Sequence, residues 1–415
     1  MSSKFIIEGG KPLAGEVNIQ GSKNTVLPLI AASLLTEEPV TLERVPNIRD
    51  VETMLAIAEK LGARVERNAE AHTISIQAKE LNSSAPDTEL TRRLRGSILF
   101  AGTLLGRLRE VTIPYPGGDA IGARPLRTHF NALEGLGIKI EDGELIHMDG
   151  RKMRGGDITL EESSVIATEN VILAAVLAPG TTVIHLPACE PHIQELVALL
   201  QKMGADIRWR DVLLLQINGV ERLGGTHHTV NADELETSSF AALAAATGSE
   251  ITIRGIERKY LDAVFLQLKT MGVAFETNGD TLTISKPSRR YGGFRIQSGL
   301  YPKLGSDHLP PFAVLATQAE GESLIHDWLY EGRLGYISEL QKMGANGRIL
   351  DPHRAIITGP TELRGCEMAS LDIRSGMTVL IAALAATGRS TIADIEHIDR
   401  PSIAALARQQ EGPPE

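Results

Sequence analysis

Apolar helical stretches alternate with short β-branched stretches along this 415-residue chain. Segments 170–180 and 238–248 are apolar on nearly every face of a helix, which is typical of helices buried on all sides. Such a stretch is followed by a turn and a short run rich in Thr, Ile and Val, which favours a β-strand. This combination of an Ala-rich helix, a turn and a strand occurs six times, at residues 30–45, 100–115, 173–187, 243–256, 314–328 and 381–395.

A second pattern accompanies the first and consists of a helix end, a glycine and a strand. Its glycines are spaced by 67 to 75 residues and are Gly62, Gly137, Gly204, Gly272 and Gly344. Glycine readily adopts the left-handed conformation that ends many helices. The two patterns together predict six repeated α/β units of roughly 70 residues, each in the order helix, strand, helix, strand, strand.

These six units predict a two-domain α/β protein with three units in each domain, because a chain of this length exceeds one ordinary core. The all-round apolar helices indicate helices inside and sheets outside. The last unit differs from the others, because a further glycine and strand pair should follow near residue 412, where the sequence instead reads "EGPPE". We therefore expect a shortened sixth unit with a frayed C-terminus or a compensating partner.

Composition narrows the possible functions. The net charge of −10 argues against a general nucleic-acid-binding protein, which needs a basic surface. The N-terminal sequence lacks a signal-peptide pattern, and the longest apolar runs are too short to cross a bilayer, so we expect a cytoplasmic protein without a membrane partner. Cys189 and Cys366 form no metal-binding motif and are best explained as small buried residues.

Common cofactor motifs are missing from the sequence. It contains no GxGxxG after a strand, no GxxxxGK[ST] and no HExxH. His227 and His228 could bind a metal, but no third ligand is in register, so a solvated loop is the favoured interpretation. We expect neither a metal nor a cofactor.

Charged residues beside Gly, Ser or Pro at helix entries form the remaining candidate chemistry. Lys23 and Asn24 stand at the start of the first apolar helix, where free N–H groups and the helix dipole attract anions. Each such charge alone could be an ordinary surface residue, but their shared placement favours one convergent site. The others are Arg95, Asp119, Arg124, Arg333, Arg374 and Arg400.

Motifs along nearly the whole chain resemble those of the enolpyruvyl transferase family, most closely its sugar-nucleotide branch. They are "GSKNTVLPL", "LRGSI", "PGGDAIGARP", "SSVIATENVILAA", "ELETSSF", "GSDHLPPF", "EGRLGYISELQKMGA" and "HIDR". The resemblance implies a two-domain inside-out α/β barrel of six repeated units. It places the first domain at residues 22–229 and the second at residues 1–21 plus 230–415, because the family's first strand belongs to the second domain.

The resemblance also implies an activity. Such an enzyme transfers the enolpyruvyl group of phosphoenolpyruvate to the 3-hydroxyl of UDP-N-acetylglucosamine and releases phosphate, by addition and elimination through a tetrahedral ketal. This is the first committed step of peptidoglycan synthesis, and so belongs to cell-wall biogenesis. The implied partners are these two small molecules, with no nucleic acid, and the protein is expected to be a monomer or a weak oligomer.

Catalytic roles follow from the resemblance position by position. Asp119 stands where most family members have a cysteine, which acts as general acid toward phosphoenolpyruvate, and this chain resembles the minority with aspartate. Its glycine-rich loop, with Gly117, Gly118 and Gly122, is expected to swing. Asp307 would take the proton from the acceptor hydroxyl, and Asn24 would bind the reacting centre.

Binding roles follow in the same way, with both halves of the chain contributing to one site. The phosphate of phosphoenolpyruvate is assigned to Lys23, Arg124 and Arg400. Its carboxylate is assigned to Arg333 and Arg374. The diphosphate of the nucleotide is assigned to Arg95 and the segment that contains Ser164, Val165 and Thr168.

Two alternatives stay open from the sequence. Arg127, where an acidic residue is common, and Gly332, where asparagine is usual, depart from the family pattern and leave room for another nucleotide or hydroxyl acceptor. A non-catalytic binding protein or scaffold is the other alternative, since six α/β repeats also build ring-shaped clamps. The basic residues occupy unequal positions in the repeats, which favours one site over a ring.

Overall fold

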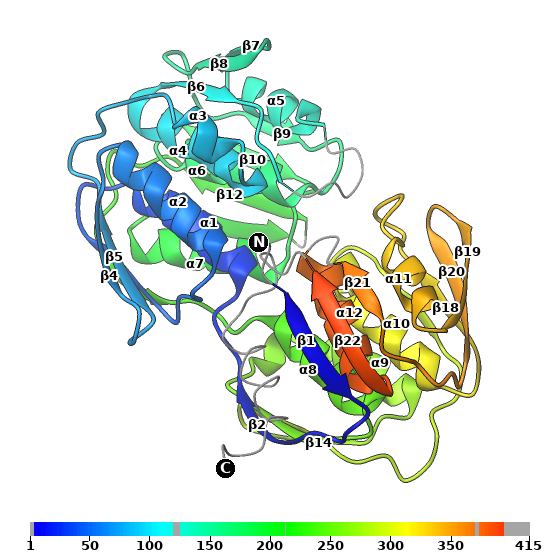
Figure 1. The fold of residues 1–415 in the computed structure, drawn as a ribbon. Coiled ribbons are helices and arrows are strands. Elements are labelled where there is room, and N and C mark those ends of the chain that lie inside the picture. Colours follow the sequence, from blue (N-terminus) through cyan, green and yellow to red (C-terminus); the bar gives the residue numbers. More distant parts are fainter. Residues whose placement is uncertain (1–3, 119–124, 212, 370–372, 394–415) are drawn as a thin grey trace. The chain divides into compact units, whose positions relative to one another are not determined.

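The computed structural model describes residues 4–118, 125–211, 213–369 and 373–393, with only the backbone described for residues 373–375 (Figure 1). The chain forms two compact units. Among the described residues, the N-terminal unit contains residues 21–118 and 125–231, and the C-terminal unit contains residues 4–20 and those from 232 onward.

Three helices form the centre of the N-terminal unit, and nearly all of their side chains are buried. They are α1 (Lys23–Ser33), α4 (Leu99–Leu108) and α6 (Val165–Ala175). The Gly102 N–H donates to Asn170 Oδ1 at 2.8 Å, and one turn later a Cβ at Gly106 would lie 3.0 Å from the Leu173 carbonyl oxygen. Later residues of α4 thus contact later residues of α6, so the two helices run in the same direction.

Helix α1 runs in that direction too. The Thr103 hydroxyl donates to the Ala31 carbonyl at 3.0 Å, and a Cβ at Gly106 would lie 3.0 Å from Leu35 just beyond α1. The amino ends of the three helices therefore gather at one end of the unit.

Amphipathic helices and three sheets surround this centre. The additional helices are α2 (Arg49–Lys60), α3 (Thr88–Thr91), η1 (Arg95–Ile98), α5 (Arg127–Glu134) and α7 (Pro191–Lys202). The sheets have the strand orders β13-β3-β5-β4, β6-β8-β7 and β11-β12-β10-β9. Their strands are β3 (Val40–Glu43), β4 (Arg64–Asn68), β5 (Thr73–Gln77), β6 (Glu110–Pro114), β7 (Lys139–Glu141), β8 (Leu145–Asp149), β9 (Asp157–Thr159), β10 (Thr181–His185), β11 (Asp206–Asp211), β12 (Leu214–Asn218) and β13 (Thr226–Thr229).

The C-terminal unit repeats this arrangement. Its buried helices are α8 (Glu234–Ala246), α10 (Leu309–Gln318) and α12 (Ile373–Ala385), accompanied by η2 (Arg258–Tyr260), α9 (Asp262–Met271), η3 (Ser306–His308) and α11 (Tyr336–Lys342). The sheets have the orders β15-β16-β14-β2, β17-β18-β20-β19 and β1-β22-β21. Their strands are β1 (Phe5–Gly9), β2 (Ala14–Asn18), β14 (Glu250–Arg254), β15 (Phe275–Asn278), β16 (Thr281–Ile284), β17 (Arg295–Gln297), β18 (Gly321–His326), β19 (Asn346–Asp351), β20 (Arg354–Gly359), β21 (Glu367–Ala369) and β22 (Gly388–Ala393).

The order helix, strand, helix, strand, strand is confirmed in the first five repeats, and the described part of the sixth contains α12 and β22. The sequence pattern did not predict the additional strands that precede helices of later repeats, such as β9, β13 and β17. The glycine turns are confirmed. All five glycines of the second sequence pattern have positive φ, between 79° and 106°. A side chain at these positions would force the strained left-handed conformation, which explains why glycine recurs there.

Strand β1 completes the sheet of the last repeat. It pairs antiparallel with β22, from Phe5 opposite Ile392 to Gly9 opposite Gly388, and Figure 1 shows the blue β1 beside the orange-red β22. In the preceding repeat, β20 has this antiparallel position next to β18. In the last repeat, β1 from the N-terminal end of the sequence thus has the position that β20 has in the preceding repeat.

Strand β2 also enters a sheet whose other strands lie far along the chain. It runs parallel to β14, with Val17 opposite Ile253, whereas α8 of the same repeat begins only at residue 234. The N-terminal unit is therefore inserted in sequence between the first strand and the first helix of a C-terminal repeat.

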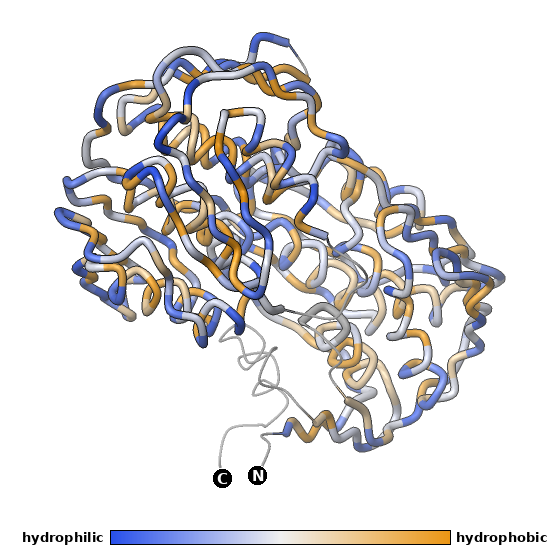
Figure 2. The backbone as a smooth tube through the Cα atoms, turned by 90° about the horizontal axis from the view of Figure 1, so that it is seen from above, coloured by the Kyte–Doolittle hydropathy of each residue, from blue (hydrophilic) through white to orange (hydrophobic). Residues whose placement is uncertain are grey.

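Hydropathy follows this layered arrangement within each unit. Figure 2 shows hydrophobic residues concentrated along interior helices and alternating with hydrophilic ones along outer strands. Each unit has its own continuous cluster of buried apolar side chains. Among the residues with a described structure, no helix is long and apolar enough to cross a membrane.

Candidate active site

Predicted site residues of the N-terminal unit lie at the amino ends of its buried helices. Lys23 is the first residue of α1, Arg95 begins η1 just before α4, and Ser164 is the N-cap of α6. Because the helices run in the same direction, their free N–H groups and positive dipole ends favour an anion at this end of the unit.

The Lys23 ammonium forms an ion pair with Asp50 of α2, with 2.5 Å between Nζ and Oδ2. The two side chains are only 15% and 22% exposed, so the pair is held in one place. Asn24 follows Lys23 in the first turn of α1 and is half-buried. A phosphate oxygen at this helix end would meet a positioned cation.

Arg95 lies beside a buried histidine of α5. Burial and the Arg95 charge lower the pKa of His129 to about 3, so this ring is neutral at pH 7. Its Nδ1 lies 3.3 Å from Asn170 Nδ2, and a neutral ring can accept this hydrogen bond. The neutral His129 ring therefore adds no second positive charge beside Arg95.

The chain leading to Asp119 is packed tightly against this region. A Cβ at Gly117 would lie 1.7 Å from the Arg92 carbonyl oxygen, and one at Gly118, where φ is +111°, would lie 2.9 Å from Arg95 Cβ. These two glycines let their backbone lie close to Arg92 and Arg95. The sequence suggested loop movement as the role of these glycines and did not predict this close packing. Asp119, Gly122 and Arg124 lie outside the described residues.

The first turn of α6 holds the predicted diphosphate segment. Ser164 Oγ accepts a hydrogen bond from the Ala167 N–H at 3.4 Å. The Thr168 hydroxyl donates to the Ser164 carbonyl at 2.8 Å and accepts from the Ala188 N–H at 3.0 Å. Thr168 is fully buried, so it holds the turn in place, whereas Ser164 and Val165 are half-buried at the helix end.

In the C-terminal unit, the structure joins two predicted residues directly. Arg333 Nη2 lies 2.5 Å from Asp307 Oδ1, and their side chains are 5% and 19% exposed. The guanidinium also lies 5.0 Å from the centre of the Tyr330 ring. Burial alone would lower the pKa of Arg333, but the nearby carboxylates of Asp307 and Asp327 outweigh it and raise the pKa.

Asp327 connects the segments that carry this pair and was not among the predicted residues. Its Oδ1 accepts hydrogen bonds from the hydroxyls of Ser298 and Ser306 and from the backbone N–H groups of Leu329 and Tyr330. Ser298 and Asp327 directly follow the parallel neighbours β17 and β18. A polar residue directly after each of two predicted strands is the sequence signal that could have identified this cluster.

Glu234, at the head of α8, was also missed by sequence reasoning. Burial, followed by the charges of Asp233, Asp307 and Glu257, raises its pKa to about 8. Its Oε2 atom is buried and has no hydrogen-bond partner among the described residues. A hydrogen bond of 2.7 Å between Ser238 Oγ and His308 Nδ1 ties the head of α8 to η3, which carries Asp307.

The last two predicted residues are only partly covered by the structure. Arg374 lies in the first turn of α12, where the backbone alone is described. Arg400 lies outside the described residues.

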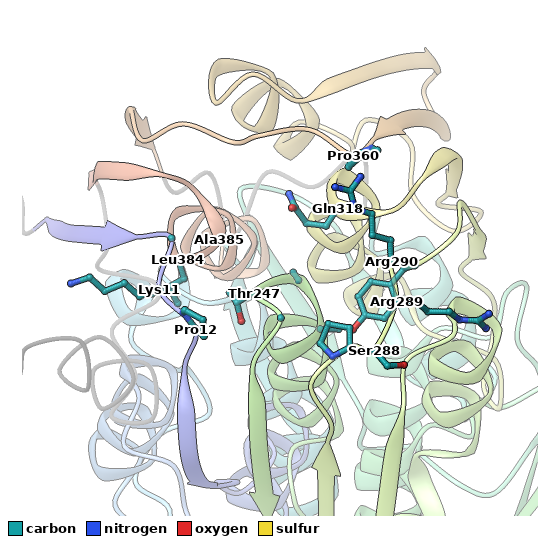
Figure 3. A pocket seen from close by; sticks show the side chains of 16 residues that line it. Lys11, Pro12, Thr247, Ser288, Arg289, Arg290, Gln318, Pro360, Leu384 and Ala385 are labelled. Atoms are coloured by element: carbon teal, nitrogen blue, oxygen red, sulfur yellow. The ribbon is translucent and has the colours of Figure 1, made fainter.

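A cavity of about 470 Å³ lies at the carboxyl ends of the same buried helices of the C-terminal unit (Figure 3). Its lining includes Ala246 of α8, Gln318 of α10 and Ala385 of α12, each the last residue of its helix. The lining also includes the basic residues Lys11, Arg289 and Arg290, so charge does not exclude an anion there. None of the predicted site residues with a described side chain lines this cavity, so the amino ends of the helices are the better candidate site.

Comparison with known proteins places the chain among enolpyruvyl transferases. A family model for EPSP synthase (3-phosphoshikimate 1-carboxyvinyltransferase) matches residues 7–401. The UDP-N-acetylglucosamine 1-carboxyvinyltransferase of Treponema denticola is 40% identical over 405 residues, which cover 96% of this chain and 95% of that protein. The protein of the same name from Bradyrhizobium diazoefficiens is 40% identical over 406 residues, which cover 96% and 94%.

Solved structures agree on the fold. The enolpyruvyl transferase NikO from Streptomyces tendae has a TM-score of 0.87 at 21% identity, and an EPSP synthase from Acinetobacter baumannii has a TM-score of 0.74 at 19% identity. Each match covers 98% of both chains. These likenesses confirm the inside-out α/β fold class, and the near-complete family match confirms the resemblance seen in the motifs. The chain belongs to the EPSP synthase family of enolpyruvyl transferases.

Proposed function

We propose that this protein transfers the enolpyruvyl group of phosphoenolpyruvate to the 3-hydroxyl of UDP-N-acetylglucosamine and releases phosphate. The observation that carries the proposal is 40% identity, over 96% of the chain, to relatives named for this transfer. The protein would then act in the cytoplasm, in the first committed step of peptidoglycan synthesis.

The proposed reaction has two stages. In the first, the acceptor oxygen attacks C2 of phosphoenolpyruvate, its proton passes to a base, and C3 gains a proton from an acid, which gives a tetrahedral ketal. In the second, C3 loses a proton and the bond from C2 to the phosphate oxygen breaks. The products are the enolpyruvyl ether and inorganic phosphate, so atoms and charge balance.

Asp307 is the proposed base and Arg333 a proposed ligand of the substrate carboxylate. The 2.5 Å ion pair between them supports this assignment, because it places a carboxylate and a buried guanidinium together. A guanidinium forms paired hydrogen bonds to a carboxylate, which suits recognition of phosphoenolpyruvate. Arg374 is the proposed second ligand of the same carboxylate.

Asp119 is the proposed acid that delivers the proton to C3. An isolated aspartic acid, with a pKa of about 3.9, is almost fully ionised at neutral pH. The reaction therefore requires that burial or a neighbouring anion raise the pKa of Asp119. The substrate phosphate is such an anion.

The remaining proposed roles concern binding. Lys23, Arg124 and Arg400 would hold the phosphate of phosphoenolpyruvate, and Asn24 would contact the reacting centre. Arg95, Ser164, Val165 and Thr168 would serve the nucleotide diphosphate. The arrangement of α1, α4 and α6 supports this part, since their amino ends gather beside Lys23, Arg95 and Ser164.

Phosphate release provides the test. The purified protein is incubated with phosphoenolpyruvate and UDP-N-acetylglucosamine, with each omitted in turn, and with UDP or 3-phosphoshikimate in place of the acceptor. We expect release only with the complete pair, together with a nucleotide product whose mass has increased by one enolpyruvyl group. Preferential turnover of 3-phosphoshikimate, or no product with any acceptor, would contradict the proposal.

A further inference from the structure

Asp307 and Arg333 occupy each other in the structure, although the proposed reaction needs both of them for the substrate. Their charged atoms are 2.5 Å apart, and Arg333 is 5% exposed. A second carboxylate at Arg333 would compete with Asp307 for the same positive charge, even if it used other N–H groups of the guanidinium. The pair therefore raises the question of which carboxylate yields.

We propose that the carboxylate of phosphoenolpyruvate displaces Asp307 from Arg333, so that Asp307 becomes available as the base only after phosphoenolpyruvate has bound. This inference rests on the proposed function and adds a step in which substrate binding makes the base available. The exchange couples occupation of the substrate site to release of the base.

Asp327 is the carboxylate beside Arg333 that stays in place. Its Oδ1 accepts from two serine hydroxyls and two backbone N–H groups, and the side chain is buried. Movement of Asp327 would leave all of these donors without their acceptor, which is costly inside a protein. Asp327 therefore keeps a fixed negative charge near Arg333 while other groups exchange.

Asp307 is the carboxylate that can yield. Its side chain is 19% exposed, whereas the Arg333 side chain is 5% exposed, so a ligand reaches Asp307 more readily than it could pull Arg333 outward. The Tyr330 ring, 5.0 Å from the guanidinium, also restricts movement of Arg333. A substrate carboxylate has the charge and shape of the aspartate group that it replaces.

Release changes the chemistry of Asp307. A carboxylate bound to a guanidinium is a weak base, because the cation stabilises its ionised form. The loss of the cation makes Asp307 a stronger proton acceptor, as removal of a hydroxyl proton requires.

Calorimetric titration of phosphoenolpyruvate into wild type and Asp307→Asn tests the exchange. Saturating UDP is present, so that the nucleotide is represented without an acceptor hydroxyl. Asparagine has nearly the shape of aspartate but cannot compete as an anion for Arg333. We expect Asp307→Asn to bind phosphoenolpyruvate about fivefold or more tightly than wild type, and to lose about a hundredfold or more of its turnover with UDP-N-acetylglucosamine.

Two controls separate exchange from a general charge effect. Glu320→Gln removes one negative charge from the same unit, at an exposed ion pair with Arg290, and should leave affinity and turnover within about twofold of wild type. Inorganic phosphate, which lacks a carboxylate, should bind Asp307→Asn and Glu320→Gln with equal affinity. Thermal unfolding of each variant shows whether it is folded.

The possible results distinguish the two proposals. Equal or weaker binding of phosphoenolpyruvate to folded Asp307→Asn, with normal wild-type turnover, would overturn the exchange and keep the proposed function. Tighter binding to Asp307→Asn, without wild-type turnover of UDP-N-acetylglucosamine, would support the exchange and overturn the proposed acceptor. If neither form binds phosphoenolpyruvate, both proposals are wrong.

Discussion

At the scale of single residues, Glu234 is a buried acid whose ionisation opposes folding. Its pKa is raised from 4.5 to about 8 in the folded protein, because burial disfavours the charged form. Between these two values the unfolded chain releases the proton and the folded chain retains it, so this residue lowers stability as pH rises from about 4.5 to 8. Below pH 4.5 both states are protonated, and the effect disappears.

Glu234→Gln should therefore stabilise the protein most at high pH. We expect the free energy of unfolding to rise by roughly 2–4 kcal/mol at pH 8.5 and to change little at pH 4.5. Urea unfolding at pH 4.5, 6.5 and 8.5 measures this difference. Glu322→Gln, at an exposed position of β18, is the matched control and should show no comparable dependence on pH. A pH-independent effect of Glu234→Gln would contradict the argument.

Asp119 gives a second prediction at this scale. Asp119→Ala should lower turnover by roughly two to four orders of magnitude, the usual contribution of a general acid, and steady-state kinetics measure the loss. A carboxylate is a poorer nucleophile than a thiolate toward epoxides, so fosfomycin should leave the wild type without a covalent adduct. Mass spectrometry should detect an adduct only in Asp119→Cys. Unchanged turnover in Asp119→Ala, or an adduct on Asp119, would remove its proposed role.

Residues found from sequence and residues missed by it differ in one physical respect. Lys23, Arg95 and Ser164 stand at helix starts, a local feature that the apolar periodicity marks. The raised pKa of Glu234 comes first from its burial in the folded unit, and Asp327 accepts a hydrogen bond from Ser298, 29 residues away in sequence. Neither property can be read from the local pattern. The joining of Asp307 to Arg333 likewise depends on how η3 and the turn after β18 pack together.

At the scale of elements, one carboxylate organises the segments after β17 and β18. Asp327→Ala would leave buried donors on Ser298, Ser306 and the following turn without an acceptor. We expect a loss of about 2–4 kcal/mol in the free energy of unfolding, together with a larger loss of affinity for phosphoenolpyruvate than for the nucleotide, because that turn leads to Arg333. Denaturant unfolding and calorimetric titration measure the two effects.

Asp327→Asn is the matched comparison for that variant. It keeps an Oδ1 acceptor and loses only the charge, so its stability should lie closer to wild type than that of Asp327→Ala. Equal destabilisation in the two variants would show that the charge, rather than the hydrogen-bonded framework, holds these segments together.

At the scale of the whole molecule, the pattern predicted the repeats but not the strand pairing that completes the last sheet. The apolar pattern and the recurring glycines identify repeated units because both are local and periodic. The pairing of β1 with β22 has no local signal, since residues opposite one another, such as Phe5 and Ile392, come from the two ends of the described chain. The pattern predicted a frayed end or a compensating partner, and the family resemblance assigned residues 1–21 to the second domain. The assembled sheet shows that β1, within that segment, pairs with β22.

The two units should differ in their ability to fold as fragments. Residues 21–231 contain every strand of the three N-terminal sheets, whereas residues 232–415 lack β1 and β2 of the C-terminal sheets. We expect the first fragment to unfold cooperatively in urea, monitored by circular dichroism. The second should gain cooperative unfolding only when residues 1–20 are fused to it. Independent, cooperative folding of residues 232–415 alone would contradict this expectation.

The place of β1 also has a consequence during synthesis. Its partner β22 emerges from the ribosome about 380 residues later, which is roughly 20–80 s at ~5–20 residues per second. During that interval the entire N-terminal unit can fold while the nascent Phe5–Gly9 segment waits with its backbone unpaired. Chaperones that bind unpaired extended segments are therefore expected to act on Phe5–Gly9 during this interval.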